Sequence, residues 1–471
     1  MNAAIAESGR ALVRSSIDST MKSLVVLFKD TDAVTLLAFV ADTLTKVPSE
    51  VIPQNPAWLS GLIILLRKLV VSRSTSVGRA AYTQAAAALL QAFPHQTPTL
   101  LFETKSSKDK DPDVKPFTYL FINLLLIDIR SSYPSLLPKL NSAEYPALSK
   151  RLAAAFDVIS SFIGYLIRSL DDEDGDFIMP PDLLLKLRKD IAETISLTIE
   201  YLRDRYDASV AGALGLHPDA AGGPATYGGS GLQLTYDSIK DDISHDALVL
   251  ASVRTLAIWL REDENEKLRG EAAGLTDLMT NLYKASSSND SDFRFPILTA
   301  LEANLTTEQG IDTFLEQETW NVLAQDLANI VQLTLRKGAQ QDFATLEAST
   351  EQDASRGIEI VRVLLAAVDD FAVTEPPNAW MQVVPAAAGL SADKDTSISL
   401  TCLELEIAIV QLATALLSKA SSTLRRSHRE SIAALAGLMV KLRVKCRQGQ
   451  GRLDDLGEAV EDVIIELENL R

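Results

Sequence analysis

Glycine-rich and acidic segments are the first places where residue spacing could support chemistry. Seven glycines lie within Asp207–Gly231, and such a loop can cradle a phosphate. A P-loop, however, has the pattern G-x-x-x-x-G-K-[ST] after a strand, because backbone N–H groups and one lysine converge on the phosphates. No lysine follows Gly228, Gly229 or Gly231, and no strand pattern precedes them. The sequence disfavours a nucleotide site here and predicts a flexible linker.

The acidic run Asp171–Asp176 resembles a calcium-binding EF-hand loop, with Gly175 at the sixth position. In that register Leu170 would be the first ligand and Pro181 the twelfth, and neither side chain carries a carboxylate. We interpret the run as a solvated acidic turn between two helices. Weak cation binding is the alternative.

The other residues with catalytic or metal-binding chemistry are scattered. The chain has four histidines, which lie in separate segments: His95, His217, His245 and His428. Cys402 and Cys446 are 44 residues apart and form neither a zinc pattern nor a disulfide framework. No G-x-S-x-G nucleophile elbow occurs. We predict no catalytic residues, no metal site and no cofactor, and therefore a protein that is not an enzyme. An active site assembled only by the fold stays open.

The composition indicates a folded, acidic protein. Its 471 residues exceed the size of one hydrophobic core, so the chain divides into domains or grows by repetition. Apolar residues make up 47% and charged residues 23%, as in ordinary globular proteins. The net charge of −18 repels phosphate backbones and anionic lipids. We therefore expect no nucleic-acid partner and no unaided docking on membranes.

Several features predict a soluble cytoplasmic protein with no integral membrane segment. Residues Met1–Arg14 lack the apolar core of a signal peptide. The longest apolar runs, Leu59–Leu66 and Phe117–Ile127, are too short to span a bilayer. Two cysteines in so long a chain fit a reducing compartment. Peripheral membrane association and the oligomeric state stay open.

Helical periodicity covers most of the chain, whereas the alternation typical of strands is nearly absent. Val249, Val253, Leu256 and Leu260 share one stripe, which neighbouring apolar residues widen, and this width indicates burial on more than one side. A helix inside a stack of helix pairs has neighbours on both sides. We therefore predict an all-α fold, an armadillo- or HEAT-like helical-repeat superhelix (an α-solenoid). The predicted helices are Leu12–Phe28, Asp32–Lys46, Trp58–Val71, Gly78–Phe93, Phe117–Ser131, Tyr145–Leu170, Pro181–Arg205, Asp241–Arg261, Lys267–Lys284, Phe295–Leu305, Trp320–Arg336, Gly357–Phe371, Ser397–Ser418, Ser427–Arg447 and Leu453–Leu470.

Two loops and two connectors organise these helices. The Gly-rich segment predicts an N-terminal helical lobe over residues 1–206, a linker over 207–235 and a C-terminal helical lobe over 236–471. Lys105–Lys115 reads as a charged insert between helices. Ala339–Ser355 reads as a polar connector that could be helical, and Glu375–Asp395 as a second connector.

One basic segment stands out against the acidic chain. Residues Lys419–Arg452 carry nine basic side chains and one acidic side chain. The simpler interpretation is an exposed helix face that balances a neighbouring acidic helix. The functional interpretation is a docking patch for an acidic partner, a phosphorylated site or an anionic lipid. Its candidate residues are Arg425, Arg426, Arg429, Lys441, Arg443, Lys445 and Arg447. Of these, Arg443, Lys445 and Arg447 are expected to contribute to one contact.

The last predicted helix has an apolar stripe and an acidic face. Leucine and valine recur at intervals of three and four between Leu453 and Leu470, and six acidic residues occupy the other face. A capping helix with a polar outer side has this pattern. A short coiled-coil contact with another chain is the alternative.

Three segments resemble the neurochondrin family. Asp246–Leu275 (DALVLASVRTLAIWLREDENEKLRGEAAGL) resembles the family segment in which a helix ends in a Trp-Leu-acidic sequence and Leu-Arg follows. Phe293–Leu323 (FRFPILTALEANLTTEQGIDTFLEQETWNVL) resembles the Leu-Leu-Pro, Leu-Thr-x-Glu and glycine-centred segment, and Ser149–Leu170 shows a looser similarity. The residues involved are mostly structural: Trp259, Leu260, Leu268, Arg269, Pro296, Thr306 and Glu308.

The resemblance implies an armadillo-like superhelix in the cytoplasm that acts through protein contacts and is not an enzyme. In animals the family is linked to neurite growth, kinase regulation and membrane-trafficking partners. The chain looks shorter than those relatives, and we expect a divergent or lower-eukaryotic member. No catalytic residue transfers, because the family supplies none.

Two functional hypotheses follow. The first is a non-enzymatic interaction scaffold of neurochondrin type, which regulates or assembles protein partners in the cytoplasm. The alternative is a HEAT- or armadillo-type transport or assembly adaptor, a chaperone-like carrier, whose acidic surface would hold basic client proteins. Binding that weakens steeply with salt would favour the adaptor.

Overall fold

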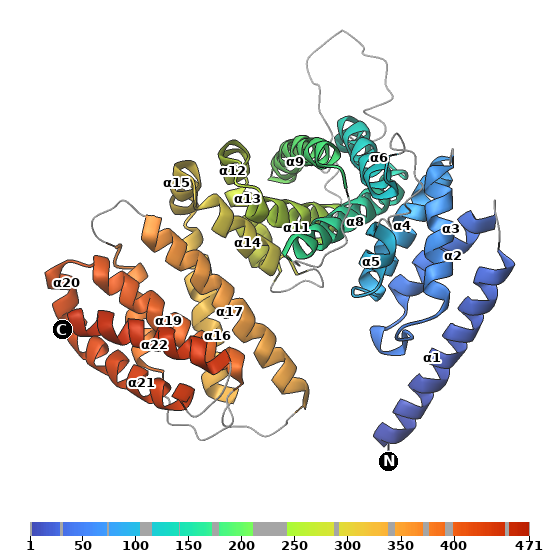
Figure 1. Ribbon diagram of the computed structural model, residues 1–471. Helices are drawn as coiled ribbons and strands as arrows, with labels where there is room; N and C mark the ends of the chain where they lie inside the picture. The colour runs from blue at the N-terminus through green and yellow to red at the C-terminus, as the bar shows by residue number, and fades with distance from the viewer. Residues whose placement is uncertain are drawn as a thin grey trace, which may run out of the picture. The chain divides into compact units, whose positions relative to one another are not determined.

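The computed structural model consists of helices joined mostly by short turns (Figure 1). It describes residues 2–28, 32–72, 75–103, 115–140, 142–171, 179–210, 243–286, 292–337, 344–370, 376–390, 399–447 and 452–470. Every regular element within these ranges is an α-helix or a short 3-10 helix, which confirms the predicted all-α helical-repeat fold class. The chain folds as two compact units, Met1–Trp259 and Leu260–Arg471.

The first unit contains the helices of the N-terminal half. They are α1 (Asn2–Leu27), α2 (Ala33–Lys46), η2 (Ser49–Val51), α3 (Trp58–Val71), α4 (Ser76–Ala92), α5 (Thr97–Phe102), α6 (Phe117–Ser132), η3 (Tyr133–Ser135), α7 (Leu136–Lys139), α8 (Tyr145–Asp171), α9 (Pro181–Val210), η4 (Ile243–His245) and most of α11 (Ala247–Glu262). Thr75 begins α4 as an N-cap, since its hydroxyl accepts a hydrogen bond from the N–H of Gly78.

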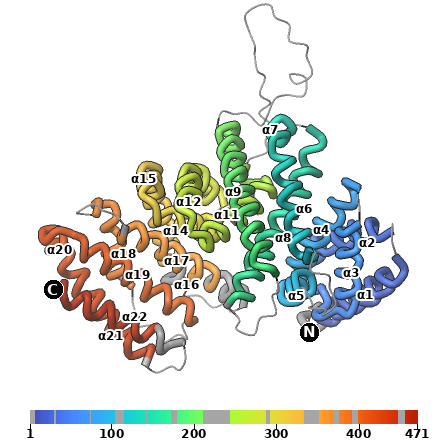
Figure 2. Tube along the Cα trace, turned by 45° about the horizontal axis from the view of Figure 1, so that its top comes forward, coloured from blue at the N-terminus to red at the C-terminus, as the bar shows by residue number. Residues whose placement is uncertain are grey.

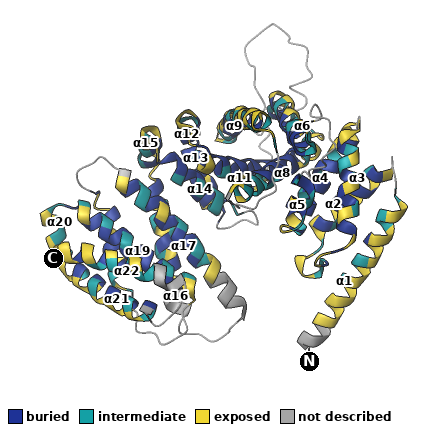
Figure 3. Cartoon of the chain, in the orientation of Figure 1, coloured by how far each residue is buried: buried dark blue, intermediate teal, exposed yellow. Residues whose placement is uncertain are grey.

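Helix α4 shows how the helices of this unit pack against one another. It packs against α2 and against α8, and buried residues occupy most of its circumference (Figures 2 and 3). Many of these residues are alanine, including Ala81, Ala85 and Ala88, so neighbouring helices can approach closely. Aromatic rings fill the wider gaps: Phe102 meets Phe162 edge-on with ring centroids 5.4 Å apart.

The second unit contains the remaining helices. They are α12 (Glu266–Ala273), α13 (Thr276–Ala285), α14 (Arg294–Asn304), α15 (Glu308–Glu316), α16 (Thr319–Lys337), α17 (Ala344–Asp370), η5 (Trp380–Gln382), α18 (Val383–Ala388), α19 (Leu400–Lys419), α20 (Ser422–Ser427), α21 (Arg429–Arg447) and α22 (Arg452–Asn469). Ser399 caps α19 by accepting from the N–H of Cys402, and Ser421 caps α20 by accepting from that of Leu424.

The core of the second unit is centred on α19, which packs against α17, α18, α21 and α22. Twelve of its twenty residues are buried, and they point in several directions. Nearby, the buried rings of Trp320 and Trp380 stack with centroids 3.8 Å apart. The tryptophans are therefore core anchors in this unit, as aromatic side chains in helical stacks usually are.

Arg269 joins three parts of the second unit. Its Nε and Nη2 donate to the carbonyl of Leu260 near the end of α11, at 3.2 and 3.0 Å. Its Nη1 donates to the hydroxyl of Thr306, in the turn after α14, at 3.0 Å. Because the last carbonyls of a helix lack partners within the helix, the guanidinium satisfies one of them. Three residues of the family-like segments thus meet in one structural contact.

The turn between α14 and α15 explains why position 310, within the family-like segment Phe293–Leu323, is a glycine. The Thr307 hydroxyl accepts from the N–H of Gly310 at 3.1 Å and donates to the carbonyl of Asn304 at 2.9 Å. A Cβ atom at Gly310 would lie 1.9 Å from that carbonyl oxygen. Only glycine fits this tightly capped turn without movement of the backbone. Thr307 is therefore the N-cap residue of α15.

Several predicted elements differ in detail. The single helix expected over Lys267–Lys284 is two helices, α12 and α13, with a break at Gly274 and Leu275. Helix α17 begins at Ala344, inside the predicted connector Ala339–Ser355. The N-terminal part of α17 is rich in Ala, Glu and Gln, which favour helix, but it carries no apolar stripe to signal packing. The short helices α5, α15, α18 and α20 were not predicted, because fewer than ten residues give little periodicity.

The predicted domain boundaries stay a prediction. Residues 207–210 of the expected linker form the last turn of α9, and the rest of the linker lies outside the described residues. Most of the insert Lys105–Lys115 and nearly all of the acidic run Asp171–Asp176 also lie outside them.

Three helical segments are long and apolar enough to cross a membrane by length and composition alone: Phe117–Lys139, Tyr145–Leu170 and Leu400–Lys419. The apolar run expected to end at Ile127 therefore belongs to a longer helical segment than the sequence indicated. In Leu400–Lys419, 67% of the most apolar window is buried against other helices. The apolar character of this segment accordingly reflects its central place in the second unit.

We expect Gly310→Ala to destabilise the second unit by about 3 kcal/mol, because the new methyl group would overlap a backbone carbonyl. The matched control is Gly457→Ala in α22, where an added Cβ would meet no atom within 4 Å. That change should be neutral or stabilise the unit by about 0.5–1 kcal/mol, since alanine favours helix over glycine. Scanning calorimetry of both variants measures the difference. Equal melting temperatures for the two variants would show that the turn at Gly310 has room for a methyl group.

Candidate functional site

The basic segment predicted as a docking patch lies on the end of α19, on α20 and on α21. Several of its charges complete contacts within the second unit. Lys419 Nζ donates to the carbonyl of Asp369 at 2.8 Å and also to that of Val368, at the end of α17. Arg425 Nε donates to the carbonyl of Ala420 at 2.9 Å. A cation near the last carbonyls of a helix is favourable, so these two side chains stabilise helix ends.

The C-terminal part of α21 also directs charges inward. Arg443 lies within 2.5 Å of Glu461 on α22 and forms an ion pair that joins the two helices. The ammonium nitrogen of Lys445 is buried without a hydrogen-bond partner, and so is Oε2 of Glu406 on α19. Burial raises the pKa of Glu406 above its ordinary value, and the positive charge of Lys445 partly offsets that rise. Lys445 and Glu406 therefore form a buried charge pair without a direct hydrogen bond.

The remaining predicted residues are more exposed. Arg426, Arg429 and Lys441 are exposed, whereas the side chain of Arg447 lies outside the described atoms. Twelve residues separate Arg429 from Lys441 on one helix, which corresponds to about 18 Å along its axis. The structure thus brings Arg425, Arg426 and Arg429 together near the start of α21, and it places Lys441, Arg443 and Lys445 near its end. Whether these residues dock a partner stays a prediction.

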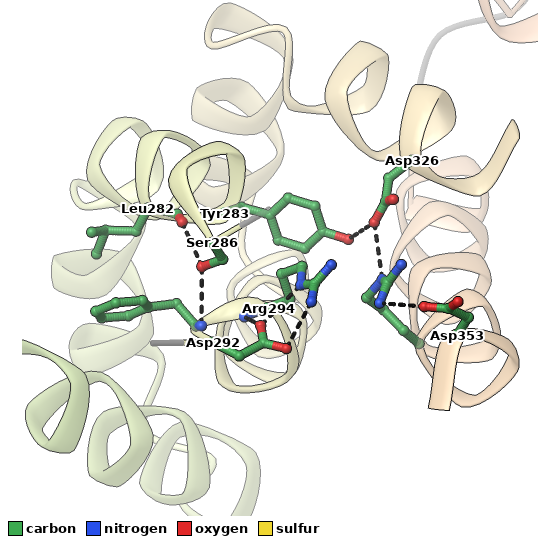
Figure 4. A network of polar contacts seen from close by, with 9 residues as sticks. Leu282, Tyr283, Ser286, Asp292, Arg294, Asp326 and Asp353 are labelled. Atoms are coloured by element: carbon green, nitrogen blue, oxygen red, sulfur yellow. Dashed lines mark hydrogen bonds and ion pairs between the residues drawn. The ribbon is translucent and has the colours of Figure 1, made fainter. Parts of the chain in front are cut away.

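A second polar cluster was not predicted from the sequence. Tyr283 on α13 donates its hydroxyl hydrogen to Oδ2 of Asp326 on α16 at 2.7 Å (Figure 4). Arg356 on α17 contacts the same oxygen at 3.1 Å and also contacts Asp353 at 3.0 Å. The guanidinium of Arg356 is almost fully buried, so its two carboxylate partners compensate its charge. Burial first, and then the charge of Asp326, raise the pKa of Tyr283 far above its ordinary value.

The other half of this cluster orders the turn into α14. Asp292 accepts from the backbone N–H and from Nε and Nη2 of Arg294, each at 2.9 Å. Burial works to raise the pKa of Asp292, but these bonds and the charge of Arg294 outweigh it and lower that pKa. The Ser286 hydroxyl donates to the carbonyl of Leu282 at 2.8 Å and accepts from the N–H of Phe293 at 3.0 Å (Figure 4).

The chemistry of this cluster is structural. Both hydrogen-bonding roles of Ser286 are occupied by backbone groups, and a tyrosine with a raised pKa stays protonated at neutral pH, so it cannot serve as a general base there. The cluster ties α13, α14, α16 and α17 together through ion pairs and hydrogen bonds. Among the residues with described side chains, no group of three or more His, Cys, Asp or Glu is arranged to hold a metal ion. Cys402 and Cys446 are both buried free thiols.

The interactions of Glu406, Tyr283, Asp326 and Arg356 were not predicted from the sequence. Tyr283 and Asp326 are 43 residues apart, and Asp326 and Arg356 are 30 apart. Contacts of this kind join different helices and leave no local pattern. The available signal was a charged residue placed among apolar positions of a helix, as Glu406 is within LTCLELEIAIV.

Comparison with known proteins gives two matches. The family model described as Neurochondrin matches residues 3–379. An uncharacterized protein of Schizosaccharomyces pombe is 23% identical over 211 residues, which are 45% of this chain and 33% of that protein. The match thus spans about a third of the length of the curated relative. No solved structure matches the chain.

We expect Lys445→Met to destabilise the second unit, because it leaves the buried Glu406 carboxylate without a counter-charge. The loss should be about 2 kcal/mol, less than for a fully buried pair because water still reaches Glu406 in part. Since the folded-state pKa of Glu406 is raised, its ionised form destabilises the fold above that pKa. The loss should therefore shrink as the pH falls from neutral toward the ordinary value of 4.5.

Thermal melting of Lys445→Met at several pH values, compared with Glu406→Leu combined with Lys445→Met, measures this effect. The double variant should be the more stable of the two at neutral pH, because no uncompensated charge remains. A single variant that melts like the unmodified protein at every pH would show that the two charges do not interact.

Proposed function

The chain belongs to the neurochondrin family, and from this premise we propose that it is a non-enzymatic interaction scaffold that assembles or regulates partner proteins in the cytoplasm. Family membership supports a protein-interaction role in general. Helical-repeat proteins bind through the side chains that their stacked helices leave exposed. Recognition of a partner then depends on exposed charges and apolar groups rather than on a catalytic pocket.

The observation that carries this proposal is the arginine cluster at the start of α21, in which Arg426 and Arg429 are exposed and Arg425 is held against the carbonyl of Ala420. Arg426 and Arg429 are exposed in a chain whose net charge is −18. Arginine is favoured at interfaces, because its planar guanidinium binds carboxylates in a bidentate manner. We therefore propose that this cluster docks an acidic segment of a partner protein.

The second candidate is an adaptor for basic client proteins. The excess of 63 acidic over 45 basic residues favours it, because such a surface attracts cationic proteins over a long range. In this alternative the arginine cluster contributes nothing to client binding.

We expect the combined change Arg426→Glu and Arg429→Glu to reduce recovery of the specific partners at least about tenfold, because like charges across an interface cost several kcal/mol. Affinity purification of the tagged protein from its own cytosol at low salt, with a high-salt wash and mass spectrometry of both fractions, measures the recovery.

The matched control reverses the charge of two exposed lysines elsewhere in the chain, by Lys46→Glu and Lys267→Glu; these side chains are 73% and 88% exposed. This control should retain the specific partners. Recovery that does not change on reversal of the arginines would refute the docking role of the cluster. Basic clients that all leave in the wash, and that are indifferent to the arginines, would establish the adaptor instead.

A further inference from the structure

The outer face of the hairpin formed by α21 and α22 exposes apolar side chains. Ala433, Gly437, Val440 and Val444 follow one another at intervals of four, three and four, so they share one face of α21. We call these four residues the outer stripe. Val440 is 53% and Val444 52% exposed, and Ile465 on α22 is 57% exposed. The buried residues of both helices lie on the opposite side, against α19 and α18.

The two helices of the hairpin carry opposite charge. Helix α21 has five basic residues and one acidic residue, whereas α22 has seven acidic residues and one basic residue. Arg443 and Lys445 turn inward, so the described exposed charges beside the outer stripe are Arg429, Lys441 and the single acidic residue Glu430. Glu458 and Asp462 are exposed beside Ile465. The face as a whole is therefore apolar along its middle, basic on one helix and acidic on the other.

We propose that this face binds a second copy of the same chain, with α21 of each copy lying on α22 of the other. A face that is half basic and half acidic is complementary to itself, provided that each half meets the opposite half. A two-fold axis parallel to the helices produces that pairing, because it exchanges the sides of the hairpin. The perpendicular two-fold axis within the interface would set α21 on α21 and join like charges, which is unfavourable.

The ion pair between Arg443 and Glu461 fixes the register of this dimer. It places residues 443 and 461 at the same height along the hairpin. A two-fold axis parallel to the helices leaves heights unchanged, so Val440 meets Ile465 of the second copy. Val444 lies at the level between Glu458 and Asp462 of the second copy. The apolar residues therefore coincide across the interface, and the charges flank them with opposite sign.

The size of the face indicates a concentration-dependent dimer. In this register α21 and α22 lie side by side over about 18 Å, and two adjacent helices about 20 Å wide give about 360 Å² for each copy. Stable interfaces bury about 800 Å² on each partner, so this dimer belongs among the weaker ones. The dimer goes beyond the proposed scaffold function, because partner docking at the arginine cluster does not require it.

The test is sedimentation of the full chain over a range of protein concentrations. The unmodified protein should move from 51.1 kDa at low concentration to twice that mass at high concentration. Val444→Glu places a carboxylate opposite the acidic α22 of the second copy and should weaken dimerisation about a hundredfold. Val77→Glu in α4 is the matched control: Val77 is 66% exposed in the other unit, and its change should leave the dimer intact.

A rescue variant tests the arrangement. Adding Asp462→Lys to Val444→Glu should restore the dimer, because each new glutamate then faces a new lysine across the two-fold axis. Circular dichroism and thermal melting of each variant check that the exposed substitutions leave the helices folded, which is the expected result. A chain that remains at 51.1 kDa at every concentration would overturn the proposal. A dimer indifferent to Val444→Glu, or a variant that Asp462→Lys does not rescue, would overturn it as well. Partner recovery is a separate measurement, so failure here leaves the scaffold function untouched.

Discussion

The structure depends on helices that bury more than one face at once. An isolated amphipathic helix has one apolar stripe, and a helix between two neighbours needs a wider one. Helix α19 meets this requirement with buried residues all around it, from Cys402 to Leu417. Helix α4 meets it with alanines, which bring its neighbours close, and with Tyr82 and Leu89 where the space is larger. Because each helix shields its neighbours from water, the removal of one would expose apolar surface on several others.

Two-sided burial has a consequence for polar groups, which must find partners in the interior. In the first unit the carboxylate of Asp246 accepts hydrogen bonds from Tyr145, from Ser149 and from the N–H of Leu248. In the second unit Asp326 joins Tyr283 to the buried guanidinium of Arg356. Buried polar groups are costly unless they are paired, so these networks fix which helices lie together. Packing supplies most of the stabilisation, whereas the networks select among the ways in which similar helices could stack.

The sequence predicted the fold class and most long helices, because the 3.6-residue periodicity is a local property that tertiary contacts reinforce. It failed where a helix is short or where its stripe is missing, as at α15 and the start of α17. For the basic segment, the sequence predicted the sign of the charge but not which side chains point inward and which are exposed. Arg443 and Lys445 turn toward acidic residues of α22 and α19, and only the packing of these helices brings those acids near. A segment that is basic in sequence therefore presents fewer positive charges on the surface than its composition indicates, because some of its side chains pair with acidic residues inside the unit.

Contacts within the second unit also distinguish the charged side chains that stabilise the fold from those that are available to bind a partner. Lys419 and Arg425 complete helix ends, and Arg443 completes the hairpin of α21 and α22. Arg426 and Arg429 are exposed and form no such contact in the described structure. The same distinction applies to apolar residues: Val460, Val463 and Leu467 fill the core, whereas Ile465 lies on the outside of α22 and is 57% exposed. An exposed isoleucine is slightly unfavourable in water, and its neighbours on that face are acidic. The proposed contact with a second copy would cover this isoleucine and bring basic and apolar groups against its acidic neighbours.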